Sequence, residues 1–163
     1  MVKKWQNHFE LQYQKGKYHT DTTDKINGKT YKMEENIAGI TQITLRFNDY
    51  NGEFLYKNAQ GNKCLKFGIG KNEFSVFPEE GYSLEMGGVY KEGNYYKCAA
   101  SAAWIEDKKL AVNVQIIDEY FGKLQILMSF NDEGEISVLM KKFAEGFLGK
   151  YKGYLTGKMM SEN

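Results

Sequence analysis

The sequence predicts an all-β fold, an antiparallel up-and-down β-barrel of about ten strands. Three observations predict it. Apolar and polar residues alternate with period two from Gly28 to about Lys158, turn residues interrupt the alternation at short intervals, and aromatic residues make up 15% of the chain. Large rings suit a pleated surface with one buried face. Because a long meander would otherwise leave two exposed edges, closure into a barrel is favoured over an open sheet.

The first half of the alternation contains five expected strands, each followed by residues typical of turns. They cover Gly28–Met33, Ile43–Phe47, Phe54–Tyr56, Leu65–Ile69 and Phe74–Val76. The clearest turns between them are 48–52, 58–62 and 70–72, which are rich in Asn, Asp and Gly. The single proline, Pro78, is expected to end the fifth strand, because it lacks a backbone amide donor.

The second half repeats this scheme with five more strands. They cover Tyr96–Trp104, Leu110–Ile116, Leu124–Phe130, Ile136–Met140 and Gly149–Met159. Residues 106–108 form one connection, and Asn131–Gly134 is a clear hairpin signal. The run Ala99–Ala103 contains only small residues, which would allow close packing or sharp curvature there. The last strand is expected to close the sheet.

The N-terminal part is less regular than the rest. Residues 1–26 are expected to be a lead-in or linker, with a loop at Thr20–Asp24 and, at most, a short strand around Leu11. Residues 27–160 then form the β-barrel domain. A length of 163 residues fits this single domain.

Composition excludes several classes of partner. Lys and Arg total 22 against 21 Asp and Glu, so no large electrostatic field is available to gather nucleic acid. No stretch is long and apolar enough for a membrane span, and the first residues do not form a signal peptide. Lysines and aromatic residues interleave between Lys141 and Lys158, and we interpret them as the decorated outer face of a terminal edge strand rather than as a membrane-binding or nucleic-acid-binding surface.

No catalytic motif is recognisable in the sequence. None of the serines lies in a G-x-S-x-G or S-x-x-K pattern, and no metal-ligand spacing involves His8 or His19, which we interpret as surface residues. We therefore expect no enzyme activity, catalytic residue, cofactor or metal. Cys64 and Cys98 could form a disulfide if their strands faced each other, but two buried free thiols are the favoured interpretation.

The remaining functional possibility in the residues is a barrel interior that holds a ligand. Tyr56, Phe67, Trp104 and Phe130 belong to the faces that the alternation turns inward. Packed core is the default for such residues. The alternative is a cavity of about 300 Å³ or more that they would line as ligand-binding residues for a small apolar molecule.

Three stretches together resemble a known family. They are Gly28–Phe47, Ala99–Trp104 with Leu110 after it, and Gly153–Gly157. The chain resembles, from about Gly28 to Lys158, the C-terminal lipocalin-like β-barrel domain of β-lactamase-related, penicillin-binding-protein-like serine hydrolases of Firmicutes. In that family, catalysis belongs to an upstream domain with a Ser-x-x-Lys nucleophile, which no position here matches.

The resemblance implies a non-catalytic accessory domain that docks on, or assists, an upstream serine hydrolase domain. It also implies an extracytoplasmic or cell-surface location as part of a parent protein. The alternative is a stand-alone lipocalin-like binder of a small apolar ligand.

Overall fold

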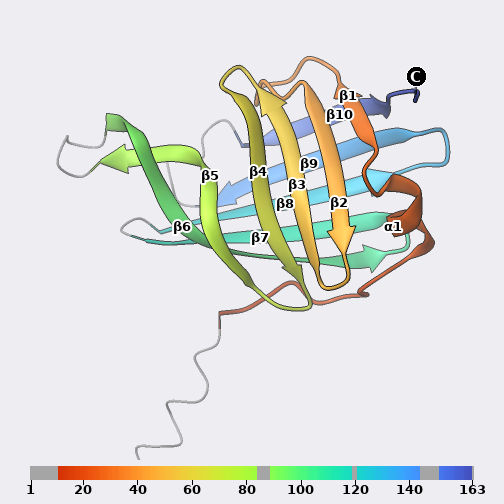
Figure 1. Cartoon of the computed structure of the whole chain (residues 1–163), viewed down its shortest axis with the longest axis horizontal. Coiled ribbons are helices and arrows are strands. Elements are labelled where there is room, and N and C mark those ends of the chain that lie inside the picture. Colours follow the sequence, from red (N-terminus) through yellow and green to blue (C-terminus); the bar gives the residue numbers. More distant parts are fainter. Residues whose placement is uncertain (1–10, 84–88, 119–120, 144–150, 163) are drawn as a thin grey trace, which may run out of the picture.

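The computed structural model describes residues 11–83, 89–118, 121–143 and 151–162, which form one short helix and ten strands (Figure 1). The helix is α1 (Asp21–Ile26). The strands are β1 (Thr30–Met33), β2 (Gln42–Asn48), β3 (Asn51–Asn58), β4 (Gly61–Ile69), β5 (Glu73–Ser83), β6 (Val89–Glu106), β7 (Lys109–Ile117), β8 (Phe121–Phe130), β9 (Glu135–Phe143) and β10 (Gly153–Met159). The predicted up-and-down β-barrel of about ten strands is confirmed.

The strands follow one another around the barrel as an up-and-down meander. Their order in the sheet is β4-β3-β2-β1-β10-β9-β8-β7-β6-β5, so that β10 joins β1 to β9. A pairing of β4 with β6, Gly68 with Ser101 and Ile69 with Ala102, closes a ring of nine strands and leaves β5 as an extra strand on β6.

The closing pair is parallel, whereas the sequence predicts antiparallel neighbours throughout. The reason is topological. The chain runs down β4, up β5 and down β6, so β4 and β6 point the same way. β5 pairs with β6 and not with β4. The barrel can therefore close only where β4 meets β6 directly, and that pair is parallel. Figure 1 shows β4 and β5 diverging from their shared turn.

The barrel interior is filled by the inward members of each alternating strand. In β3, Phe54 and Tyr56 are buried while Leu55 between them is partly exposed; in β9, Ile136, Val138 and Met140 are buried. Each such burial stabilises the fold by roughly 1.5–3 kcal/mol per large side chain. The expected period-two faces are therefore the faces of the structure.

Pro78 does not end its strand, contrary to the prediction. β5 continues to Ser83, and Pro78 lies in an irregularity where the pairing with β6 jumps from Val76–Lys97 to Glu80–Tyr95. A β-bulge leaves residues out of the ladder, so a proline without an amide donor is accommodated there.

The last strand closes the sheet, as the sequence predicts, and is therefore not an edge strand. β10 pairs with β9 on one side and with β1 on the other. Its outer face does carry lysine, since Lys158 is exposed and lies 3.5 Å from Glu135. The expected role of these lysines in protecting an edge is wrong, because the barrel removes that edge. Residues 144–150 of the lysine-rich stretch lie outside the described residues.

The described part of the N-terminal region packs on the barrel. Thr20–Asp24, expected as a loop, contains the start of α1, whose Thr22, Thr23 and Ile26 are buried. Upstream, Lys17 and Trp104 exchange two backbone hydrogen bonds of 2.8 and 3.0 Å. The domain boundary at residue 27 stays a prediction, although residues 11–26 contact the barrel.

The N-terminal segment explains the run of small residues in β6. The Gln14 amide donates a hydrogen bond of 2.7 Å to Ser101 Oγ, and a Cβ at Gly16 would lie 2.5 Å from the Trp104 carbonyl oxygen. Ser101 and Ala103 face outward yet are fully buried under this segment. Larger side chains at these positions would prevent the contact, which confirms the close packing expected for Ala99–Ala103.

Candidate ligand-binding site

Three of the four predicted ligand-binding residues lie in one aromatic cluster. Phe47 contacts both Phe67 and Trp104 at 6.1 Å between ring centroids, and Trp104 contacts Phe130 at 5.9 Å. Phe67 and Trp104 have no exposed surface. A cavity large enough for water would leave its lining side chains partly accessible, so these two side chains are packed core. Their role in ligand binding stays a prediction.

Tyr56, the fourth predicted residue, lies in a different group toward the β3–β4 turn. Its ring stacks on Phe54 at 5.2 Å and meets Tyr151 edge-on at 6.4 Å. Its hydroxyl donates a hydrogen bond of 2.7 Å to Glu79 Oε1. Burial, with the Tyr151 and Glu79 groups adding to it, raises the pKa of Tyr56 far above its usual value, so this hydroxyl stays protonated.

Phe130 borders a cavity of about 400 Å³ between α1 and the end of the barrel. Its apolar residues are Ile26 of α1, Tyr31 of β1, Phe130 of β8 and Met159 of β10. Ile26, Tyr31 and Phe130 are only 3%, 1% and 6% exposed, so they form a floor that presents little surface, whereas Met159 is partly exposed. Tyr31 and Phe130 also contact each other, with ring centroids 6.0 Å apart. Volumes of this size are typical of sites for small ligands. We call this space the α1 cavity.

Local hydrogen bonds hold α1 over this end of the barrel. The Thr20 hydroxyl donates to the Asp107 carbonyl oxygen at 2.9 Å, which ties the start of the helix to the β6–β7 turn. The Thr20 amide donates a hydrogen bond of 3.1 Å to Thr23 Oγ1. This amide lies at the start of the helix, where no helical carbonyl is available to accept it. Ile26, one turn on, is 3% exposed and points into the core.

The rim of the α1 cavity carries two lysines and one carboxylate. Lys108 Nζ lies 2.6 Å from Asp132 Oδ2, and Lys25 Nζ lies 3.9 Å from Asp132 Oδ1. The hydrogen bond from Lys108 lowers the pKa of Asp132 below its usual range. Two cations share one anion, so the rim keeps one excess positive charge beside an apolar lining.

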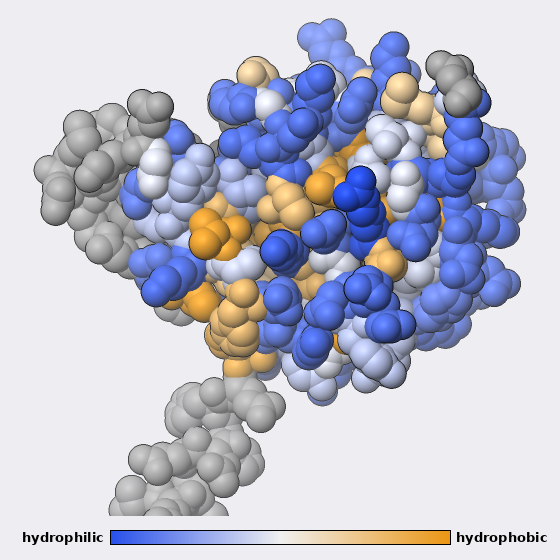
Figure 2. Space-filling view, viewed as in Figure 1, coloured by the Kyte–Doolittle hydropathy of each residue, from blue (hydrophilic) through white to orange (hydrophobic). Residues whose placement is uncertain are grey.

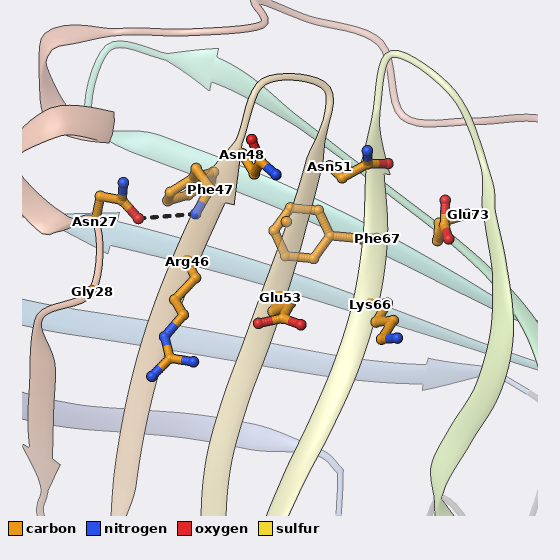
Figure 3. A pocket seen from close by; sticks show the side chains of 11 residues that line it. Asn27, Gly28, Arg46, Phe47, Asn48, Asn51, Glu53, Lys66, Phe67 and Glu73 are labelled. Atoms are coloured by element: carbon orange, nitrogen blue, oxygen red, sulfur yellow. Dashed lines mark hydrogen bonds between the residues drawn. The ribbon is translucent and has the colours of Figure 1, made fainter.

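A larger hollow of about 550 Å³ lies across β2, β3 and β4 (Figure 3). Arg46, Glu53 and Lys66 form one cross-strand row on the outer face, and Glu73 follows on β5. Their charges alternate, and the lining of this hollow carries no net charge. Its apolar part is limited to the partly exposed Phe47, because the ring of Phe67 is fully buried beneath Gly52.

Other groups considered from the sequence are dispersed. Cys64 and Cys98 are both free thiols, as favoured, but only Cys98 is buried, with its Sγ 3.6 Å from Ser75 Oγ, whereas Cys64 is partly exposed. His19 is exposed and lies 3.1 Å from Asp24, and His8 lies outside the described residues. Within the described ranges, no three His, Cys, Asp or Glu side chains converge as metal ligands. No helix in that part of the chain is long and apolar enough to cross a membrane.

Most of the α1 cavity was not foreseen from the sequence. Of its lining, only Phe130 is among the predicted site residues. One signal points to it nevertheless. In a meander, alternate turns lie at the same end of the barrel, so the connection at 106–108 and the hairpin at 131–134 must lie near each other. Lys108 and Asp132 are charged residues of those two turns.

Comparisons with known proteins add little beyond the fold. No protein-family model matches the chain, and no curated protein does. Among solved structures, the chain is similar to the fatty-acid-binding protein isolated from Manduca sexta, with 10% sequence identity and a TM-score of 0.48. That similarity covers 83% of this chain and 99% of the other. A likeness at this level does not extend to function.

Proposed function

We propose that the protein binds a small amphipathic anion, a molecule with an apolar body and a carboxylate or similar group, in the α1 cavity. The observation that carries the proposal is the combination of an apolar lining with a rim of excess positive charge. Contact of the apolar body with Met159 and with the exposed edge of Phe130 would add to the affinity. The anionic group would compete with Asp132 for Lys108 and Lys25 and thereby orient the ligand.

Tryptophan fluorescence tests this proposal. Trp104 contacts Phe130, which lines the cavity, so binding there should change Trp104 emission. A Trp5→Phe background removes the second tryptophan of the chain. We expect a saturable change with medium-chain fatty acids and with an anionic hydrophobic probe, and a weaker one with the corresponding alcohols, which lack the charge.

Two rim variants separate charge recognition from apolar binding. Lys108→Met should weaken fatty-acid binding about three- to tenfold, and Asp132→Asn should strengthen it by a similar factor, because it frees both lysines. Binding of the alcohols should change in neither variant. If the Trp5→Phe protein shows no saturable response to any acid, or if the two variants behave alike, the proposal is wrong.

A second candidate function is docking on an upstream serine hydrolase domain, as the family resemblance implies. The observation that favours docking is an exposed apolar patch: Phe74 and Val76 of β5 are 62% and 55% exposed, and Figure 2 shows apolar surface over β5. Leu11, also exposed, has its backbone tied to the start of this region by a hydrogen bond from the Asn72 side chain to its carbonyl oxygen. The test is titration with a purified hydrolase domain of that family, which should shift the amide signals of Phe74 and Val76. Shifts elsewhere, or none, would exclude this patch.

A further inference from the structure

The inner face of the β3–β4 hairpin turns polar toward its turn. Tyr56 and Lys63 are directly opposite each other, and Asn58 follows Tyr56 on the same face. Lys63 is only 13% exposed, although most lysines of globular proteins lie in solvent. A lysine on the inner face of a barrel strand needs an anionic partner, since an unpaired buried charge is strongly unfavourable.

The partner in this structure is Glu79. Its Oε1 accepts hydrogen bonds from the Tyr56 hydroxyl at 2.7 Å and from Asn58 Nδ2 at 3.0 Å. Its Oε2 lies 3.8 Å from Lys63 Nζ, and the Glu79 side chain is 16% exposed. Two hydrogen bonds and one ion pair thus converge on a carboxylate that is largely removed from water, where charge-assisted interactions are strong.

The donors and the acceptor come from different sides of a seam. Tyr56, Asn58 and Lys63 belong to one hairpin with a continuous ladder from Asn51–Gly68 to Asn58–Gly61. Glu79 belongs to β5, which is not a hydrogen-bonded neighbour of β4. Glu79 also follows Pro78 in the β5 irregularity. The donor set is therefore fixed by the hairpin ladder, while the carboxylate reaches across the seam from a strand that pairs with β6.

We propose that Tyr56, Asn58 and Lys63 form a carboxylate-binding site that the chain's own Glu79 fills, and that a small aromatic or aliphatic carboxylic acid from solution binds there in place of Glu79. Apolar rings adjoin the site. Phe54 stacks on Tyr56, and Phe77 meets Tyr151 edge-on at 6.2 Å. This site is separate from the α1 cavity and does not depend on the function proposed for that cavity.

Emptying the site by mutation tests the proposal. Glu79→Ala removes the internal carboxylate and leaves the three donors. Acetate should then raise the melting temperature of the variant saturably, by about 3–5 °C at ten times the dissociation constant. Chloride at equal ionic strength should not. Glu79→Gln is the matched control, since its amide still occupies the position, and it should not respond to acetate. The double variant Glu79→Ala/Lys63→Met should not respond either.

The wild-type protein provides a second measurement if Glu79→Ala does not fold. Benzoate must compete there with a tethered carboxylate, so it should bind at least tenfold more weakly than to the emptied site, at tens of millimolar. It should shift the Asn58 side-chain amide signals in NMR spectra, whereas neutral benzamide should not. A folded Glu79→Ala protein that ignores acetate overturns the proposal. So does a response that survives Lys63→Met, or a wild-type Asn58 signal that benzoate leaves unmoved.

Discussion

At the scale of single residues, Trp104 is the largest side chain of the core and contacts Phe130, which borders the α1 cavity. Its side chain is fully buried, yet its indole Nε1 has no hydrogen-bond partner within the described part of the chain. An unpaired buried donor costs about 1–3 kcal/mol. The aromatic contacts with Phe47 and Phe130 offset that loss. Trp104 is thus held by packing and not by polar contacts.

This predicts an asymmetry between two substitutions of Trp104. Trp104→Ala should lower the free energy of unfolding by about 3–5 kcal/mol, because it leaves a cavity. Trp104→Phe should cost less than about 2 kcal/mol, because the smaller loss of packing is partly offset by removal of the unpaired donor. Urea unfolding of both variants measures the difference. A loss of more than about 2 kcal/mol in Trp104→Phe would mean that the indole N–H is satisfied in solution.

The raised pKa of the Tyr31 hydroxyl, at the floor of the α1 cavity, predicts that the protein loses stability at high pH. Burial raises its pKa to about 12 in the folded protein, from about 10 when exposed. Folding therefore opposes ionisation of Tyr31. Its contribution to stability is complete below pH 10 and disappears as the pH rises from about 10 to about 12. The raised pKa of Tyr56 acts in the same direction. Urea unfolding across this range should show a shallower decline in Tyr31→Phe than in the wild type.

At the scale of elements, the N-terminal segment behaves as part of the barrel. Gln14 and Lys17 bond to Ser101 and Trp104 of β6, and Gln115 Nε2 of β7 donates a hydrogen bond of 2.7 Å to the Gln12 carbonyl oxygen. The Lys17 pairing occupies the β6 edge at Trp104, beyond the ends of the β5 and β4 pairings. An unpaired edge would otherwise be open to aggregation there.

Removal of this segment should therefore destabilise the fold. A chain that starts at residue 19 loses the cover of Ser101 and Ala103, and we expect its melting temperature to fall by about 5 °C or more, with increased aggregation. The control is a chain that starts at residue 11, which keeps every contact described above. If both truncated chains melt together with the full chain, the segment does not contribute to stability.

At the scale of the whole molecule, β10 is the strand that makes a ring from the two halves of the chain. It bonds β9 through six residue pairs and β1 through three. A chain that ends at Lys152 would expose both of these strands along their length. We expect it to lose cooperative unfolding and near-ultraviolet circular dichroism. A chain that ends at Met160 keeps the Met160 amide bond to the Thr30 carbonyl oxygen and should unfold as the full chain does.

Agreement between sequence and structure is best where the information is local. Alternation with period two and clusters of turn residues predict the strands and their buried faces, because neighbouring residues alone determine both. The hairpin at Asn131 is an example, since its side-chain oxygen accepts the amides of Glu133 and Glu135 within the same turn. Pro78 is the exception, because a bulge depends on the partner strand as well as on the residue.

The two candidate sites could not be predicted from the sequence, because each is formed by residues that are far apart in the chain. Phe130 and Tyr56 were expected to share one interior site, yet Phe130 faces Tyr31 and the α1 cavity while Tyr56 faces Glu79. No local pattern predicts which carboxylate reaches a lysine on the inner face of another strand, as Glu79 does with Lys63.

The sequence by itself therefore determined the barrel class, the inward faces and the turns, because side-chain alternation is a property of each strand alone. The tertiary structure decided three further features: the parallel closure of β4 on β6, the position of α1 over the barrel end, and the convergence of Tyr56, Asn58 and Lys63 on Glu79. Each of these features depends on which distant segments of the chain meet when the sheet closes. That arrangement is set by the hydrophobic burial and hydrogen bonding of the whole molecule, and not by any single segment.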